Sequence, residues 1–152
     1  FIGTDDCNLD VIQLLVQKYD GNVNSIQIVD TIEKGHRVVF NRSLLMSTID
    51  DIGCLNIVKY LVEQGADVDY SGGEGYRTAL NFAVNGGEFD IVKYLLLDCN
   101  AEIPDIFDIG FYDNQPNQKV GFIECLERAM IQNPQKMKEI LEVKNTYLLK
   151  KP

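Results

Sequence analysis

Residues 53–61 read Gly-Cys-Leu-Asn-Ile-Val-Lys-Tyr-Leu, and residues 87–95 read Gly-Glu-Phe-Asp-Ile-Val-Lys-Tyr-Leu. The two segments lie 34 positions apart (53 to 87) and share the pentapeptide Ile-Val-Lys-Tyr-Leu. In both, apolar residues stand at i, i+1, i+4 and i+5, which is typical of an amphipathic helix with one broad buried face. The centre of the chain is therefore predicted to contain one helical unit twice.

Two weaker copies of this segment flank the central pair, at residues 8–15 and 135–141, and Met137 takes the place of Ile91 in the last copy. A shorter apolar segment precedes each of the three later copies, around residues 44–46, 78–84 and 125–130. The pattern predicts about four helix pairs stacked one on the next, with little or no sheet.

The ends of the central helices are marked by residues that tolerate a left-handed backbone. Gly65 follows the first copy and Asn100 stands at the same point after the second. Glycine, and after it asparagine, is favoured where a helix ends in this conformation. Leu61 and Leu95, one turn before these ends, are predicted to be core residues.

At this point the sequence resembles the ankyrin-repeat family. Residues 78–83 read Thr-Ala-Leu-Asn-Phe-Ala, which is similar to the family motif Thr-Pro-Leu-His-x-Ala, with Ala79 and Asn81 replacing proline and histidine. Gly65–Asp69 is similar to the family's exit from the second helix. The resemblance implies an all-α, ankyrin-type helix-pair solenoid of about four repeats with two inter-repeat insertions.

The predicted organisation is a single ankyrin-repeat domain over residues 1–152. The first insertion is expected to form a short extra helix that ends at Gly35. The second carries aromatic residues that either cap the core locally or bind a partner. The predicted repeats cover about residues 1–24, 41–70, 75–104 and 119–148, and the insertions about residues 25–40 and 105–118.

The composition of the chain limits the classes of function that it can have. The chain has 14 lysines and arginines against 23 aspartates and glutamates, a net charge of −9, which disfavours nucleic-acid binding. No apolar run approaches the roughly 20 residues of a membrane-spanning helix. The first residue is Phe1 rather than methionine, and no signal peptide follows. We therefore expect part of a longer protein.

The cysteines and the histidine argue against catalysis. Cys7, Cys54, Cys99 and Cys125 fit neither a metal knuckle nor a dense disulfide framework, so four free thiols and an intracellular, cytoplasmic location are predicted. His36 is the only histidine, which excludes any site with two histidine ligands. We predict no enzyme activity, no cofactor and no metal.

The resemblance implies a protein–protein interaction module that binds its partner on the concave face, at the finger loops and the ends of the first helices. The acidic residues there predict a partner with a basic patch or basic peptide. An alternative is a recruiting domain of a larger host-targeting effector or enzyme, located in host cytoplasm. The predicted partner-binding residues are Asp50, Asp51, Asp69, Tyr70, Glu74, Tyr76, Arg77 and Asn85, with Phe107, Phe111 and Tyr112 of the second insertion as a competing site.

Overall fold

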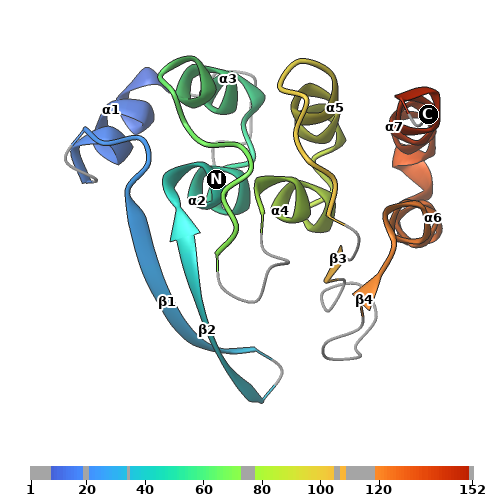
Figure 1. Cartoon of the computed structure of the whole chain (residues 1–152), viewed down its shortest axis with the longest axis horizontal. Helices are drawn as coiled ribbons and strands as arrows, with labels where there is room; N and C mark the ends of the chain where they lie inside the picture. Colours follow the sequence, from blue (N-terminus) through green and yellow to red (C-terminus); the bar gives the residue numbers. More distant parts are fainter. Residues whose placement is uncertain are drawn as a thin grey trace.

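The computed structural model describes residues 8–18, 21–33, 35–72, 78–104, 107–108 and 119–150. Within these ranges the chain is mostly helical, with one long β-hairpin near its beginning (Figure 1). The elements in chain order are α1 (Leu9–Lys18), β1 (Ile26–Glu33), β2 (His36–Ser43), α2 (Leu44–Asp51), α3 (Leu55–Glu63), α4 (Ala79–Asn85), α5 (Phe89–Leu97), β3 (Phe107–Asp108), β4 (Lys119–Val120), α6 (Phe122–Gln132), the 3₁₀ turn η1 (Pro134–Lys136) and α7 (Met137–Lys150).

The helices form two rows that run along the molecule. Helices α2, α4 and α6 make one row, and α3, α5 and α7 make the other (Figure 1). Each helix of the first row packs against its successor in the chain, α2 on α3, α4 on α5 and α6 on α7. Neighbouring pairs contact each other through α2 and α4 and through α5 and α7. The predicted stack of helix pairs is confirmed in these three pairs, whereas in the first predicted repeat the described residues contain the single helix α1.

The core lies between the two rows and follows the repeated apolar positions. Leu61 and Leu95 have no solvent exposure, as predicted, and the same holds for Ile57 and Ile91. The last copy differs, because Met137 is 45% exposed and Ile140, one turn later, is fully buried. The alignment of Met137 with the buried Ile91 is therefore wrong.

Local hydrogen bonds fix where the helices begin and end. The Ser43 hydroxyl accepts a hydrogen bond from the Met46 backbone at 3.2 Å, and the Thr78 hydroxyl accepts one from Asn81 at 3.2 Å. These are the side-chain caps that α2 and α4 need at their first turns. Gly65 and Asn100 have positive φ angles of 96° and 51°, which confirms the predicted helix ends.

The first insertion is a β-hairpin, and the prediction of a short extra helix there is wrong. Strands β1 and β2 pair antiparallel from Ile26 opposite Ser43 to Glu33 opposite His36, and Gly35 in the connection has a φ of 81°. The physical reason is a two-residue alternation: in β2, Phe40 is buried while the flanking Val39 and Asn41 are exposed. The expectation of little or no sheet therefore fails in this segment.

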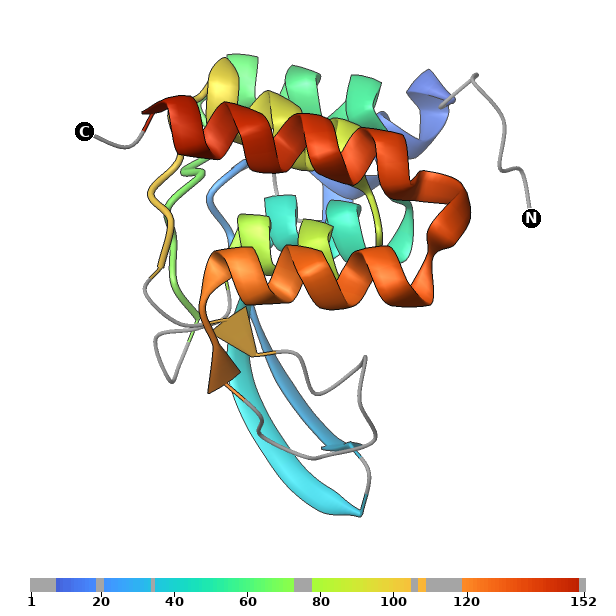
Figure 2. The same ribbon diagram turned by 90° about the vertical axis from the view of Figure 1, so that its right-hand side faces the viewer.

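The hairpin extends away from the two rows of helices (Figure 2). Its base is held by Phe40, whose ring centroid lies 6.1 Å from that of Phe82 on α4. The loop after α3 also lies against the hairpin. Gly72 of this loop is so close that an added Cβ atom would lie 1.6 Å from the Asn41 carbonyl oxygen. In the second insertion, Phe107 and Asp108 of β3 pair with Val120 and Lys119 of β4.

Candidate functional site

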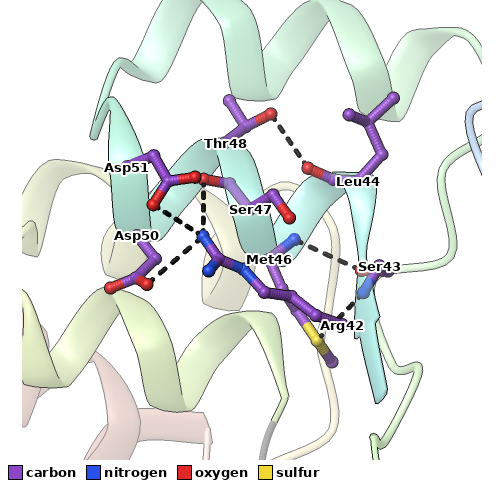
Figure 3. Close-up of polar contacts among 8 residues, drawn as sticks. All are labelled: Arg42, Ser43, Leu44, Met46, Ser47, Thr48, Asp50 and Asp51. Carbon is purple, nitrogen blue, oxygen red and sulfur yellow. Dashed lines mark hydrogen bonds and ion pairs between the residues drawn. The ribbon is translucent and has the colours of Figure 1, made fainter. Parts of the chain in front are cut away.

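Arg42 joins the hairpin to the end of helix α2 (Figure 3). It stands just before the cap residue Ser43, and its side chain runs along α2 with only 12% exposure. Its Nη2 atom lies 3.2 Å from Asp50 Oδ2 and 2.8 Å from Asp51 Oδ1, and it donates a hydrogen bond to the Ser47 carbonyl oxygen at 3.3 Å. One guanidinium therefore holds two carboxylates at the last turn of α2.

The aromatic ring of Phe82 forms one wall of this cluster. The Arg42 guanidinium carbon lies 5.9 Å from the centroid of that ring, a favourable distance for a cation and an aromatic face. A cation near the carboxyl end of a helix also meets the negative end of its dipole. The helix dipole, the contact with the Phe82 ring and the two ion pairs therefore all stabilise the same rotamer of Arg42.

The two carboxylates stay accessible although they are paired. The Asp50 side chain is 47% exposed and that of Asp51 is 66% exposed. Two acidic groups against one cation leave an excess negative charge at this end of α2. Both residues were predicted site residues, and Asn85, a third one, ends the neighbouring helix α4.

Asp69 and Tyr70 lie in the loop after α3, where both make contacts within the protein. Asp69 Oδ1 accepts a hydrogen bond from the backbone N–H of Glu102 at 2.8 Å, which links this loop to the next unit. Asn24 makes a similar link one unit earlier, where its Oδ1 accepts from the Asp67 backbone at 2.8 Å. Tyr70, a predicted partner-binding residue, is half-buried and packs against the core.

The remaining predicted residues are not placed by the structure. Glu74, Tyr76, Arg77, Phe111 and Tyr112 lie outside the described residues. Phe107 begins β3, but its side chain also falls outside the described part of the chain.

The predicted residues that are placed fall into two groups. Gly72, which follows Asp69 and Tyr70 in the loop, lies against Asn41 of β2, shortly before α2 begins at Leu44. Asp50 and Asp51 stand at the other end of that helix, and an eight-residue helix is about 12 Å long. The sequence did not predict the residue between the groups, Arg42, although an arginine directly before the helix-capping Ser43 was a signal.

The cysteines differ from the prediction of four free thiols. Cys54, at the start of α3, is disulfide-bonded, whereas Cys99 and Cys125 are free. Burial raises the pKa of Cys125 to about 12, and burial also raises the pKa of Cys99. Both free thiols are therefore protonated near neutral pH, which makes them poor nucleophiles.

Comparison with known proteins agrees with the stack of helix pairs. A family model described as Ankyrin repeats (3 copies) matches residues 4–105, which is more than half of the chain. No curated protein and no solved structure matches it. Among the described residues, no helix is long and apolar enough to cross a membrane. Ankyrin repeats are generally protein-interaction modules and typically non-catalytic, and this chain belongs to the ankyrin-repeat family.

Proposed function

We propose that the chain binds a partner protein through the acidic surface at the carboxyl ends of α2 and α4, formed by Asp50, Asp51 and Asn85. The observation that supports this most is the pair of exposed carboxylates tied to the nearly buried guanidinium of Arg42. The surface fits a basic patch or a basic peptide, because lysine and arginine side chains pair with exposed carboxylates.

Arg42 prepares this surface for binding. A free aspartate side chain loses rotamer entropy when it docks, and a side chain already held in an ion pair loses less. Asp50 and Asp51 are held by the same nitrogen atom, so their mutual spacing is set before a partner arrives. The net charge of −9 adds long-range attraction for a basic partner at low salt.

The loop after α3 would supply a second contact. Asp69 is exposed, and its hydrogen bond to Glu102 fixes its position relative to the following unit. The two groups of residues stand at opposite ends of α2, so a partner lying along the first helices would touch both. Glu74, Tyr76 and Arg77 of the same finger belong to the proposed surface by sequence.

The test is capture of basic proteins from lysate by the wild type and two charge-matched variants. Asp50→Asn with Asp51→Asn removes two negative charges from the proposed surface. Glu63→Gln with Glu139→Gln removes the same charge from exposed positions on α3 and α7. We expect the first variant to lose the captured partner and the second to retain it. The first variant also deprives the nearly buried Arg42 of its two carboxylate partners, so circular dichroism must show that its helices remain folded. Equal loss of the captured partner in both variants would show that capture depends on the net charge of the chain and not on the Asp50 and Asp51 surface.

A further inference from the structure

Strand β1 is an open edge of the hairpin. Among the described residues it pairs with β2 alone. Backbone N–H and C=O groups alternate in direction along an antiparallel strand, so half of those in β1 face away from β2. The opposite edge is different, because Gly72 lies against Asn41 of β2. An additional strand therefore has access at β1.

This edge lacks three of the features that commonly prevent strand addition, although it carries the acidic residues Asp30 and Glu33. Natural edge strands are commonly interrupted by proline, lysine or a β-bulge. Strand β1 reads Ile-Gln-Ile-Val-Asp-Thr-Ile-Glu, without proline or lysine, and its register with β2 runs through eight consecutive pairs without a bulge. Ile28 and Ile32 are each 73% exposed on one face of it. Such a strand favours pairing with another extended chain.

The formal charges of the two hairpin strands sum to zero. Arg37 Nε and Nη2 donate to Asp30 Oδ1 and Oδ2 at 2.9 and 2.6 Å, a two-bonded pair between neighbouring strands. Glu33, the other acidic residue of the two strands, is matched in number by Arg42. The strands are thus electrically neutral although the whole chain carries −9. Two hairpins can meet without the repulsion that acts between two acidic helical bodies.

The sequence of the edge is nearly symmetric about Asp30. Ile28-Val29 precedes it and Thr31-Ile32 follows, and valine and threonine have almost the same shape. From this symmetry, the open edge and the neutral strands we infer that β1 pairs antiparallel with β1 of a second copy of the chain, in a register centred on Asp30. Ile28 of each copy then lies opposite Ile32 of the other, and Val29 lies opposite Thr31.

Arg37 is what makes this register possible. The two-fold axis brings the Asp30 carboxylates of both copies together, and like charges directly opposite each other destabilise a sheet. Each carboxylate, however, already carries its own two-bonded arginine. Because the hairpin extends away from the helices (Figures 1 and 2), the two helical bodies stay apart when the strands pair. The Asp50 and Asp51 surface takes no part in this contact.

The first test compares two identical substitutions at exposed isoleucines. Ile28→Lys places two like charges in the paired edge, whereas Ile131→Lys changes a 79% exposed residue of α6, far along the chain from the hairpin. In sedimentation velocity over a concentration series, we expect a wild-type dimer, a roughly tenfold or greater rise in its dissociation constant with Ile28→Lys, and no change with Ile131→Lys. A wild type that stays monomeric, or a dimer indifferent to Ile28→Lys, overturns the inference.

The second test addresses the register through charge. Arg37→Ala leaves two unneutralised carboxylates at the two-fold axis, so the dimer should weaken, and more strongly at low salt. Arg37→Ala combined with Asp30→Asn removes both charges and should restore the dimer. A dimer that Arg37→Ala leaves intact, or that the double variant fails to restore, contradicts the register centred on Asp30. Circular dichroism of each variant checks that the helices remain folded.

Discussion

Glu88 and Lys136 connect the turns inside three successive helix pairs. Glu88 precedes α5 and reaches back one unit, where its Oε1 atom lies 2.6 Å from the position of a Cβ on Gly53. From the following unit, Lys136 Nζ donates a hydrogen bond to the Gly87 carbonyl oxygen at 2.7 Å. Burial raises the pKa of Glu88, and the charge of Asp90 acts in the same direction, while Lys136 lowers it. The net shift shows that desolvation outweighs the lysine.

A raised carboxyl pKa has a defined effect on stability. The native state holds the Glu88 proton more tightly than the unfolded state, so the charged form is a cost to folding. This cost is absent below the ordinary pKa of glutamate and is complete once the pH exceeds the raised value. We expect Glu88→Gln to increase the melting temperature at pH 7 and to have little effect near pH 3. Thermal unfolding by circular dichroism at the two pH values measures the difference; a fall at pH 7 would mean that the Lys136 attraction dominates.

Among the elements, the helices were predictable and the hairpin was not. The central helices repeat an apolar pattern over whole turns, so their type, ends and buried faces follow from the sequence. In the first insertion Ile26, Val29 and Ile32 also recur every three residues, which imitates a helix. The strands form because both sides of Gly35 are rich in β-branched residues and the fold offers Phe82 as a contact for Phe40. That contact lies 42 positions away (40 to 82), and a local pattern does not include it.

Gly72 determines how closely the loop after α3 approaches the hairpin. A Cβ there would meet the Asn41 carbonyl oxygen at 1.6 Å and its carbonyl carbon at 2.7 Å, both backbone atoms that do not yield. We expect Gly72→Ala to push the loop off β2, to lower the melting temperature and to speed amide exchange in β2. Gly121→Ala is the matched control, because a Cβ there meets nothing within 4 Å. Hydrogen exchange by mass spectrometry compares the two, and equal protection of β2 in both would contradict this account.

At the scale of the whole molecule, the main contacts of each helix pair within the described residues are with its neighbours in the stack. Stability in such an array is close to a sum over units and their interfaces, so the effect of a substitution depends on where its unit stands. Leu61 and Leu126 are both fully buried leucines, the first in α3, which lies between α1 and α5 (Figure 1), and the second in the last pair. Truncation to alanine costs about 2–5 kcal/mol at such positions.

The two leucine truncations should differ in how much of the chain they destabilise. Leu126→Ala weakens only the last interface, so faster exchange should appear in α6 and α7 while α2 to α5 keep their protection. Leu61→Ala weakens the interior and should accelerate exchange on both sides of α3. Hydrogen exchange resolved by peptide separates the two patterns. If Leu126→Ala destabilised the whole chain uniformly, the stack would behave as one cooperative block.

The acidic residues of the candidate site were predictable from the sequence, but the contacts that hold them in place were not. Asp50 and Asp51 are found from the alignment of the repeats, because they end a first helix. Their shared partner, Arg42, belongs to β2, which continues past the predicted end of the insertion at residue 40 into the predicted second repeat, and the alignment of the repeats did not show this strand. Asp69 was predicted as a partner-binding residue, but its hydrogen bond from the Glu102 backbone could not be predicted, because it forms only when successive units stack.

Arg42 also affects how this protein could change during evolution. Repeat arrays commonly gain and lose whole segments, and a surface insertion is usually the easiest to delete. Here a deletion of the hairpin would also remove the cation that Asp50 and Asp51 share and the ring that covers Phe82. Descendants that discard the hairpin would therefore need compensating substitutions in α2 and α4, so the insertion and the following repeat are inherited as one unit.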